Sequence, residues 1–301
     1  MNREFTVKII CLVGILALGL LAVLPMQTAG ADNSRWMAEL DDAREINTLA
    51  IPGTHDSGAT HSIADLSGKC QSLSISEQLE LGVRFFDIRL QLNNNELVVV
   101  HSFVDQATDF DDVLRCMTDF LKENPTEFLV VSFKEDSDPK SSDVDFRETL
   151  EEMLKANKNV SQSTAIPKTV GEARGRLHVI SRYHGSTIGY PAYEGWQDST
   201  SFELGELYVQ DHYRVDDAKT KKADIMEAMQ IADRCEHALV LNFTSCYYPN
   251  PFPPTYAGTP ALEINPWLID FLEENGDASG VFLCDFITSE LCETIIGRNF
   301  E

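Results

Sequence analysis

Short apolar runs alternate with amphipathic stretches along most of this 301-residue chain. Eight of the runs have the length and the β-branched or aromatic content of strands, and polar or turn residues follow them. They are INTLAI (46–51), VRFFDIRL (83–90), LVVVH (97–101), EFLVVSFK (127–134), LHVISR (177–182), ELYVQD (206–211), ALVLNF (238–243) and GVFLCDF (280–286). Because strands that alternate with helices favour a parallel sheet, the pattern predicts an α/β fold, a single irregular (β/α)8 barrel of the TIM type.

Helical periodicity fills most of the intervals between these runs. Several of the helical segments begin with Ser, Asp or Asn, which are preferred N-caps, and two of them stop at Gly or just before Pro. The predicted helices are SISEQLELG (74–82), FDDVLRCMTDFLKENP (110–125), DFRETLEEMLKANK (145–158), DDAKTKKADIMEAMQIADRC (216–235) and NPWLIDFLEENG (265–276).

Two connections depart from regular alternation. QLNNNE, after the second strand, is too short for a helical crossover and predicts a hairpin turn centred on Asn94, which would set Asp87 opposite His101. The connection over 183–205 is long, rich in Gly and aromatic residues, and shows no helical period. Since long loops inside compact domains usually carry function, we expect an irregular barrel with a functional loop there.

The first 31 residues have the features of a secretory signal peptide. Arg3 and Lys8 precede an apolar run over 9–24, and small residues end the segment at Ala31. We therefore expect cleavage after Ala31, a barrel domain over 32–301 and a secreted, extracellular protein. The alternative is an uncleaved membrane anchor, although the apolar run is short for a comfortable membrane span.

Cysteine content is even once the predicted signal peptide and its Cys11 are removed. Six cysteines remain, and in an exported chain an even number indicates disulfides. Pairing of neighbours in the sequence would join Cys70 to Cys116, Cys235 to Cys246 and Cys284 to Cys292. Buried, inert thiols are the alternative, and no Cys-x-x-Cys spacing indicates a metal or redox site.

The formal charge of −24 limits the classes of partner. Nucleic acid binding requires a basic stripe, so we expect no nucleic acid partner. Electrostatic docking on strongly anionic membranes is also disfavoured. A substrate that carries phosphate would need cations concentrated at one place.

Charged and polar residues gather where the apolar runs end. Functional residues of barrel enzymes collect at the carboxyl ends of the strands, and positions two apart on a strand share a face. The residues at these ends are His55, Asp87 with Arg89, His101, Lys134, Arg182, Asp211 with Tyr213, and Asp285. Each alone has a structural explanation, such as a rim charge or a capping histidine, but their recurrence at one end predicts a site. The other histidines are predicted to be structural or superficial: His61, His178, His184, His212 and His237.

The composition of this set favours acid–base chemistry on a phosphate. Two histidines oriented by carboxylates can act as general base and general acid, while Arg and Lys supply positive charge. No HExxH motif, Cys/His cluster or dense carboxylate set indicates a metal. Arg89 occupies a position at which a metal ion could otherwise bind the phosphate.

The ordered motifs resemble the phosphatidylinositol-specific phospholipases C of the bacterial type, single irregular barrels that share an X-region with larger eukaryotic phospholipases C. The resemblance spans nearly the whole predicted mature chain. It rests on IPGTHDSG, GVRFFDIR, VVVHS, FLVVSFKED, HVISR, QDHY and FLCDF in that order.

The resemblance implies a role for each residue of the reaction centre. His55, held as a base by Asp285, would take the proton of the inositol 2-hydroxyl, and Arg89 would bind the phosphate that the alkoxide attacks. His101 would protonate the departing diacylglycerol oxygen, with Asp56 and Asp87 nearby. The products would be diacylglycerol and inositol 1,2-cyclic phosphate, which makes such an enzyme formally a lyase.

The resemblance also implies an inositol pocket and no metal. Lys134, Arg182 and Asp211 would bond to the ring hydroxyls. Tyr213 would stack on the ring, and Trp196, in the long loop, would be a further contact. An arginine at position 89 is similar to the metal-independent relatives, so no cofactor is expected.

Membrane contact is the part in which this sequence departs from the family. The segment 59–81 lacks the tryptophan expected of an interfacial helix, and the aromatic run CYYPNPFPPTYAGTP (246–260) would replace it. The alternative is that this run is an ordinary Pro-rich surface loop. The expected partner is phosphatidylinositol or a glycosylphosphatidylinositol (GPI) anchor, met by transient peripheral contact with a membrane.

Two other functions remain open. One is a metal-dependent glycerophosphodiester phosphodiesterase, also a barrel with a histidine near a strand end, although Arg89 would oppose a metal. The other is a non-catalytic X-region module that binds lipid or sugar. The presence of both histidines with their carboxylates argues against the second.

Overall fold

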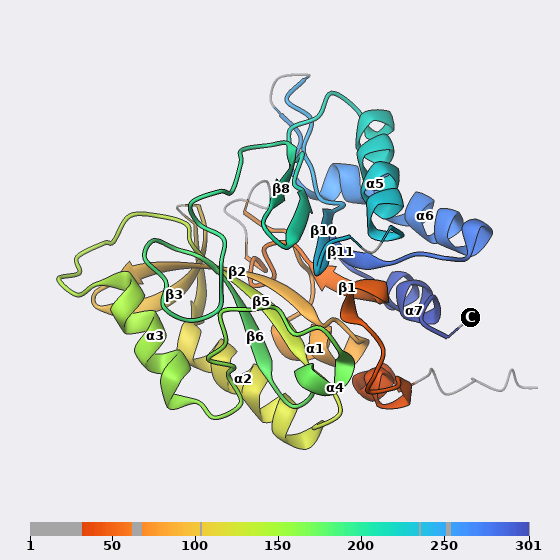
Figure 1. The fold of residues 1–301 in the computed structure, drawn as a ribbon. Coiled ribbons are helices and arrows are strands. Elements are labelled where there is room, and N and C mark those ends of the chain that lie inside the picture. The colour runs from red at the N-terminus through yellow and green to blue at the C-terminus, as the bar shows by residue number, and fades with distance from the viewer. Residues whose placement is uncertain (1–31, 62–67, 103, 235, 251–253, 301) are drawn as a thin grey trace, which may run out of the picture. The chain divides into compact units, whose positions relative to one another are not determined.

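Eleven strands form one sheet in the described part of the chain, and helices cover its outer face (Figure 1). The computed structural model describes residues 32–61, 68–102, 104–234, 236–250 and 254–300. The strands are β1 (Ala50–Thr54), β2 (Phe85–Asn93), β3 (Glu96–His101), β4 (Val104–Asp109), β5 (Leu129–Glu135), β6 (Leu177–Arg182), β7 (Tyr190–Pro191), β8 (Ser201–Leu204), β9 (Leu207–Gln210), β10 (Leu239–Phe243) and β11 (Gly280–Cys284). The predicted signal peptide over 1–31 lies outside the described residues.

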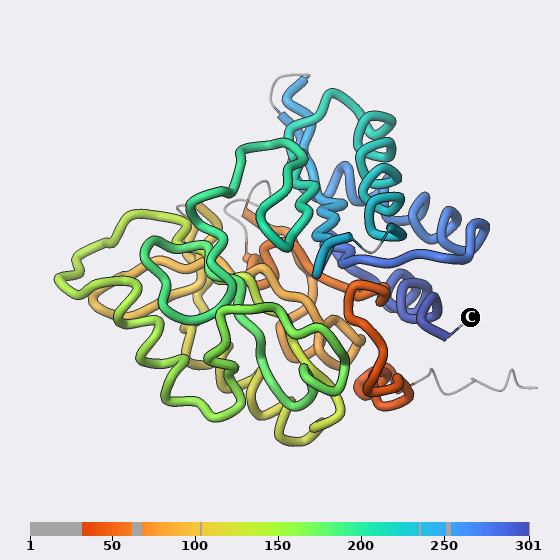
Figure 2. The backbone as a smooth tube through the Cα atoms, in the orientation of Figure 1, coloured from red at the N-terminus to blue at the C-terminus, as the bar shows by residue number. Residues whose placement is uncertain are grey.

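The sheet has the order β7-β6-β5-β2-β1-β11-β10-β9-β8. Pairing from β7 to β9 is parallel, whereas β8 joins β9 in the antiparallel sense. The pairing of β1 with β11 therefore puts the first and last strands side by side in the middle of the sheet (Figure 2). Within the described residues no ladder joins β7 to β8, so the barrel is not closed by hydrogen bonds.

All eight predicted strands occur, and the largest shift of a boundary is at the start of β1. Ile46–Thr48 is a 3-10 turn, closed by the Thr48 hydroxyl on the carbonyl of Glu45, and β1 begins only at Ala50. Three short strands, β4, β7 and β8, were not predicted, because their sequences are polar or too brief to show a period. The last two lie within the long connection over 183–205.

The predicted hairpin forms between β2 and β3 with a different register. Asn94 and Asn95 both have positive φ, as a two-residue primed turn requires, and Asn93 pairs with Glu96. The centre lies between the two asparagines instead of on Asn94. The expected opposition of Asp87 and His101 was therefore wrong, and the ladder reaches only Leu90 with Val99.

Local capping signals explain where the helices begin and end. In α1, Ser74 and Glu77 form a reciprocal capping box and Gly82 ends the helix in the left-handed conformation. The helices are α1 (Ile75–Leu81), α2 (Phe110–Glu123), α3 (Phe146–Ala156), α4 (Val170–Ala173), α5 (Ala218–Ala232), α6 (Gly258–Asn275) and α7 (Ser289–Gly297), preceded by a 3-10 segment, Asn33–Glu39. The short α4 and α7 were not predicted, and α6 begins seven residues earlier than predicted, with Pro266 inside it.

Alternation along the strands divides the buried side chains into two cores. Ile51, Val130 and Val281 point inward with their equivalents on the neighbouring strands. Phe86 and Phe282 point outward, into the layer under the helices. Because the same alternation continues past the apolar residues, the next inward positions lie at the carboxyl ends of the strands, where the polar residues are.

The predicted disulfides are not formed among the described residues. Cys70, Cys116, Cys246, Cys284 and Cys292 are all free thiols. The pairs 70/116 and 284/292 were therefore wrong: Cys70 contacts His101 instead, and Cys284 and Cys292 are fully buried as apolar side chains of the outer core. The third pair includes Cys235, which lies outside the described residues.

A membrane-spanning helix is absent from the described ranges. None of their helices combines the length and the apolar character that crossing a bilayer requires.

Candidate active site

The loop after β1 sends two side chains in different directions. Asp56 has φ of 43°, and its backbone N–H donates to Asp87 Oδ2 at 3.2 Å. Ser57 fastens the same loop to β2, since its hydroxyl accepts from the Asp87 N–H at 2.8 Å. Gly58 allows the loop to lie against β3, because a Cβ there would come within 2.5 Å of Val99. The tight turn after the strand thus presents His55 and Asp56 to separate partners.

His55 pairs with Asp285 across two adjacent strands. The register sets Thr54 beside Cys284, so the residues that follow meet, and His55 Nδ1 lies 2.8 Å from Asp285 Oδ1. Burial and the charge of Arg89 lower the pKa of His55, but Asp285, through its charge and its hydrogen bond, and Asp56 together outweigh them, so the net pKa is raised. The Nδ1–H donates to Asp285, which leaves Nε2 as the acceptor of Arg89 Nη2 at 2.7 Å.

His101, at the end of β3, forms the second pair. Its Nδ1 lies 3.0 Å from Asp56 Oδ2 and 3.5 Å from the thiol of Cys70. The next residue, Ser102, has φ of 54°, and its N–H donates to Asp136 Oδ2 at 2.7 Å. The end of β3 is therefore held toward β5, and the second imidazole faces the same space as the first.

Three cations lie in one row across β2, β5 and β6. Arg89 is in register with Lys134, and Lys134 with Arg182. One position deeper, Asp87 Oδ2 accepts from Arg89 at 3.2 Å and its Oδ1 accepts from Arg182 at 3.2 Å. The buried carboxylate of Asp87 thus joins the two arginines, whereas Lys134 pairs with Asp136.

The pKa values follow from these contacts. Burial raises the pKa of Asp87, but Arg89 and Arg182 overcome burial and hold the pKa well below its usual value. Burial lowers the pKa of Arg89, yet Asp56 and Asp87 raise it well above its usual value. Burial and the neighbouring Arg89 lower the pKa of Lys134. Arg89 is therefore a permanent positive charge with one edge toward His55.

Aromatic residues form the opposite side of the space. Arg182 lies over the ring of Trp196, with 3.6 Å between Cζ and the ring centroid, and the Trp196 Nε1–H donates to Asp211 Oδ2 at 3.1 Å. Tyr213 lies farther out, where its hydroxyl donates to Asp198. Burial and Asp198 raise the pKa of Tyr213 to about 12, so its hydroxyl stays neutral.

One cavity of about 930 Å³ joins these groups. Nine of the predicted site residues line it: His55, Arg89, His101, Lys134, Arg182, Trp196, Asp211, Tyr213 and Asp285. The remaining two, Asp56 and Asp87, are fully buried directly behind the lining. The arrangement can remove a proton at one imidazole and return one at the other, with a guanidinium between them.

Comparison with known proteins agrees with this geometry. Residues 50–182 match the family described as phosphatidylinositol-specific phospholipase C, X domain. The segment over residues 50–182 belongs to this X-domain family. The "1-phosphatidylinositol phosphodiesterase" of Listeria monocytogenes is 26% identical over 88% of this chain and 84% of its own length. The Staphylococcus aureus protein of the same name is 29% identical over 83% of this chain and 87% of its own.

Solved structures of proteins from the same two species support the fold. A phosphatidylinositol-specific phospholipase C structure from S. aureus has a TM-score of 0.79 at 26% identity and covers 88% of this chain and 97% of that one. The L. monocytogenes enzyme, at 23% identity, has a TM-score of 0.75 and covers 90% of this chain and all of its own. The predicted irregular α/β barrel is thereby confirmed.

Two residues of this X domain that the sequence did not indicate lie directly at the histidines. Cys70 lines the cavity, and burial, followed by Asp285, raises the pKa of its thiol well above the usual value. Gln71 is fully buried and donates to the carbonyls of His55 and Cys284, each at 2.8 Å. Both lie in a polar stretch before α1 with no periodicity, so only their spatial neighbours reveal them.

Gln71→Leu is expected to destabilise the fold and to disturb His55. The substitution removes the donor of the His55 carbonyl, whereas the Cys284 carbonyl still accepts from the His55 N–H at 3.1 Å. One unsatisfied buried group costs about 1–3 kcal/mol. Urea unfolding should show a lower midpoint at an unchanged m-value, and kcat should fall while KM changes little. A kcat equal to that of the native protein would mean that Gln71 does not position the His55–Asp285 pair.

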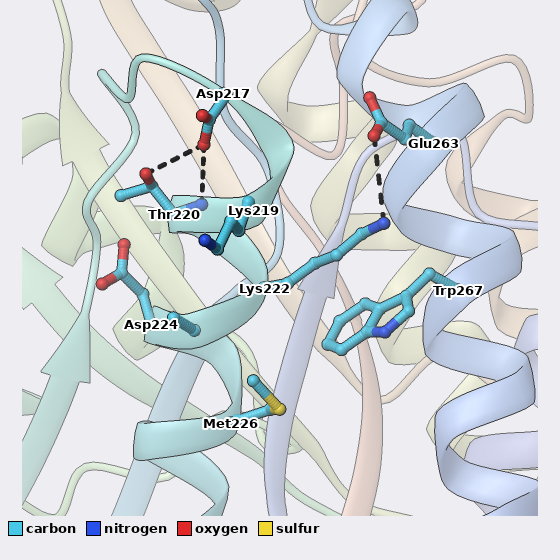
Figure 3. Close-up of a pocket in the computed structure, with 9 residues that line it drawn as sticks. Asp217, Lys219, Thr220, Lys222, Asp224, Met226, Glu263 and Trp267 are labelled. Atoms are coloured by element: carbon cyan, nitrogen blue, oxygen red, sulfur yellow. Dashed lines mark hydrogen bonds and ion pairs between the residues drawn. The ribbon is translucent and has the colours of Figure 1, made fainter.

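A second hollow, outside the segment that matches the X domain, lies between α5 and α6 and has a volume of about 790 Å³ (Figure 3). Lys222 extends across it, 3.9 Å from Glu263 and 5.4 Å from the ring centroid of Trp267. Asp217 caps α5 there through the N–H of Thr220 at 2.8 Å. These polar groups are matched to one another, and the hollow is lined by no histidine or cysteine.

Proposed function

We propose that this protein is a phosphatidylinositol-specific phospholipase C that cleaves the glycerol–phosphate bond without a metal ion. The observation that carries the proposal is the pair of histidine–carboxylate contacts, His55 with Asp285 and His101 with Asp56, on either side of Arg89 in one cavity. The names of its relatives supply the lipid class, and the geometry supplies the acid, the base and the charge.

In the proposed reaction, the nucleophile comes from the substrate. His55 Nε2 accepts the proton of the inositol 2-hydroxyl, and the resulting oxygen attacks the adjacent phosphorus. Without substrate, Arg89 donates a hydrogen bond to His55 Nε2. With substrate, Arg89 turns to the phosphate oxygens and stabilises their growing negative charge. His101 in its imidazolium form gives a proton to the departing diacylglycerol oxygen. The products are diacylglycerol and inositol 1,2-cyclic phosphate.

The rest of the cavity suits a polyol ring. Buried Arg182 and Asp211, with Lys134 beside them, offer fixed donors and acceptors, which ring hydroxyls need when they lose water. Trp196 holds both Arg182 and Asp211 in place. We propose that Tyr213 supports the face of the ring at the mouth.

Membrane contact is proposed at the rim of the same cavity. Tyr193 and Tyr256 line it and are each 47% exposed. Tyrosine suits the headgroup region of a bilayer, so these two residues would make the transient peripheral contact. Secretion by means of residues 1–31 is part of the same proposal, as is activity on either free phosphatidylinositol or a GPI anchor.

Phosphorus NMR of the purified protein with phosphatidylinositol micelles tests the function. A cyclic inositol phosphate signal that appears with EDTA present is expected. Turnover only after metal addition would indicate a metal-dependent phosphodiesterase instead. Absence of turnover under every condition would indicate a binding module.

Asp285→Asn is expected to shift the acid limb of the pH profile of kcat/KM to lower pH. His55 must be neutral to act as a base, and Asp285 raises its pKa above the ordinary 6.5. Removal of the negative charge therefore lowers the pKa of His55 and extends activity to lower pH, while the height of the profile falls because the imidazole loses its orientation. An acid limb at an unchanged pH would show that His55 is not the titrating base.

A further inference from the structure

Cys70 lies between the two histidine–carboxylate pairs. Its thiol, together with His55 and Asp285 on one side or Asp56 and His101 on the other, forms groups whose ligand atoms all lie within 4.8 Å of one another. Such a mixed set of sulfur, nitrogen and oxygen ligands suits a borderline-soft cation, whereas calcium and magnesium prefer oxygen alone.

The two groups differ in the hydrogen bonds that their side chains already make. His55 is hydrogen-bonded at both nitrogens, by Asp285 and by Arg89. Asp56 is fully buried, yet neither of its oxygens accepts a side-chain or backbone hydrogen bond from the described residues, although Oδ2 lies 3.0 Å from His101 Nδ1 and 3.4 Å from Arg89 Nε. A buried carboxylate without such a donor is costly, and a cation beside it would remove the cost.

The spacing of this second group fits a tetrahedral zinc ion. Zn–S and Zn–N bonds of about 2.3 and 2.0–2.1 Å, at tetrahedral angles, put sulfur and nitrogen about 3.5 Å apart and nitrogen and oxygen about 3.3 Å apart. The thiol of Cys70 lies 3.5 Å from His101 Nδ1, and Asp56 Oδ2 lies 3.0 Å from the same nitrogen. These two distances therefore need shifts of only a few tenths of an ångström, and the third, from the sulfur to a carboxylate oxygen of Asp56, is within 4.8 Å.

The charge around the group also admits a cation. Arg89 lies 3.4 Å from Asp56, but it also pairs with Asp87 at 3.2 Å and with Asp136 at 3.9 Å, so three carboxylates share its single positive charge. Cys70 and His101 both line the cavity, so an ion can enter from it and keep one position for water.

We propose that Asp56, Cys70 and His101 form an inhibitory zinc site. Zinc binds the deprotonated thiol, His101 Nδ1 and one carboxylate oxygen, and the thiol proton passes to solvent. His101 then carries its remaining proton as a neutral, metal-bound imidazole, which is a much weaker acid than an imidazolium. The binding does not depend on the proposed function, whereas the inhibition rests on it.

Cobalt absorption and zinc titration test the binding. The metal-free full-length protein should develop a thiolate-to-cobalt charge-transfer band with Co²⁺, and calorimetry should show one tight Zn²⁺ per chain. Cys70→Ala should lose the band and weaken zinc binding by about tenfold or more, since even residues behind a metal's ligands affect affinity on that scale. Cys116→Ala is the matched control, because this half-buried thiol on α2 does not line the cavity.

Cleavage of phosphatidylinositol micelles tests the inhibition. Zn²⁺ should suppress the activity of the native protein and of Cys116→Ala, and EDTA should restore it. Cys70→Ala should resist zinc relative to its own zinc-free rate. A Cys70→Ala variant that keeps native folding, the cobalt band and full zinc sensitivity would overturn the proposal. A cobalt band in a native protein without any turnover would keep the binding site and overturn the proposed function.

Discussion

His55→Ala is expected to lower kcat for phosphatidylinositol cleavage by about 10²–10⁴-fold, the usual contribution of a positioned general base. His55 Nε2 accepts from Arg89 at the cavity, and its Nδ1 is fixed by Asp285. KM should change little, because the alanine removes no contact that holds the inositol ring. Single-turnover measurements of cyclic phosphate formation would give the rate of the chemical step directly.

A matched control for this prediction exists in the same chain. His212 Nδ1 lies 2.9 Å from Asp224 Oδ2, so it forms a histidine–carboxylate pair of nearly the same length, and His212 does not line the cavity. His212→Ala should leave kcat within a factor of about two. His55→Gln, which keeps a donor toward Asp285, should be folded and equally inactive. A His55 variant that cleaves at the native rate would show that another group is the base.

Arg89→Lys is expected to lower kcat by about 10²–10³-fold, comparable to the loss of one oxyanion-binding donor in other enzymes. Lysine keeps the positive charge that Asp87 and Asp56 require, so the fold should survive. It cannot reproduce the flat guanidinium, which contacts Asp87 and His55 at once and would span two phosphate oxygens. The loss should therefore appear in kcat, whereas the thermal unfolding midpoint should change little.

Arg115→Lys provides the comparison for the arginine. Arg115 is exposed on α2 and pairs only with the acidic residues of its own helix, Asp111 and Asp112, as far as the described residues show. Its replacement should change neither kcat nor stability measurably, because exposed ion pairs contribute little. Equal effects of the two substitutions would remove Arg89 from the phosphate site.

Patterns along the chain were sufficient to predict the scaffold and most of the cavity lining. Parallel strands buried on both faces require short apolar runs, and their inward residues change from apolar to charged where the core ends. This change from apolar to charged residues is sufficient to predict that His55, Arg89, Lys134 and Asp285 lie at one end of the barrel. The order of the motifs then indicated the X-domain family, which the comparison confirmed.

Errors arose where local sequence does not determine the spatial partner. The hairpin turn is centred between Asn94 and Asn95, which both have positive φ, and not on Asn94 as predicted. The cysteines were paired by sequence order, yet the thiol of Cys70 lies 3.5 Å from the imidazole of His101. Asp136 lies beside both Arg89 and Lys134, and its pKa is lowered to about 2. The sequence does not indicate this residue, because it is one of several acidic residues in the same loop.

The division between these outcomes has a physical reason. Strand periodicity, helix capping and the change from apolar to charged residues are properties of neighbouring residues, so they can be recognised along the chain without a structure. The pairing of His55 with Asp285 and of Asp56 with His101 joins residues far apart in sequence. Those contacts follow from which strands lie side by side and from one tight turn after β1, and only the packed barrel sets them.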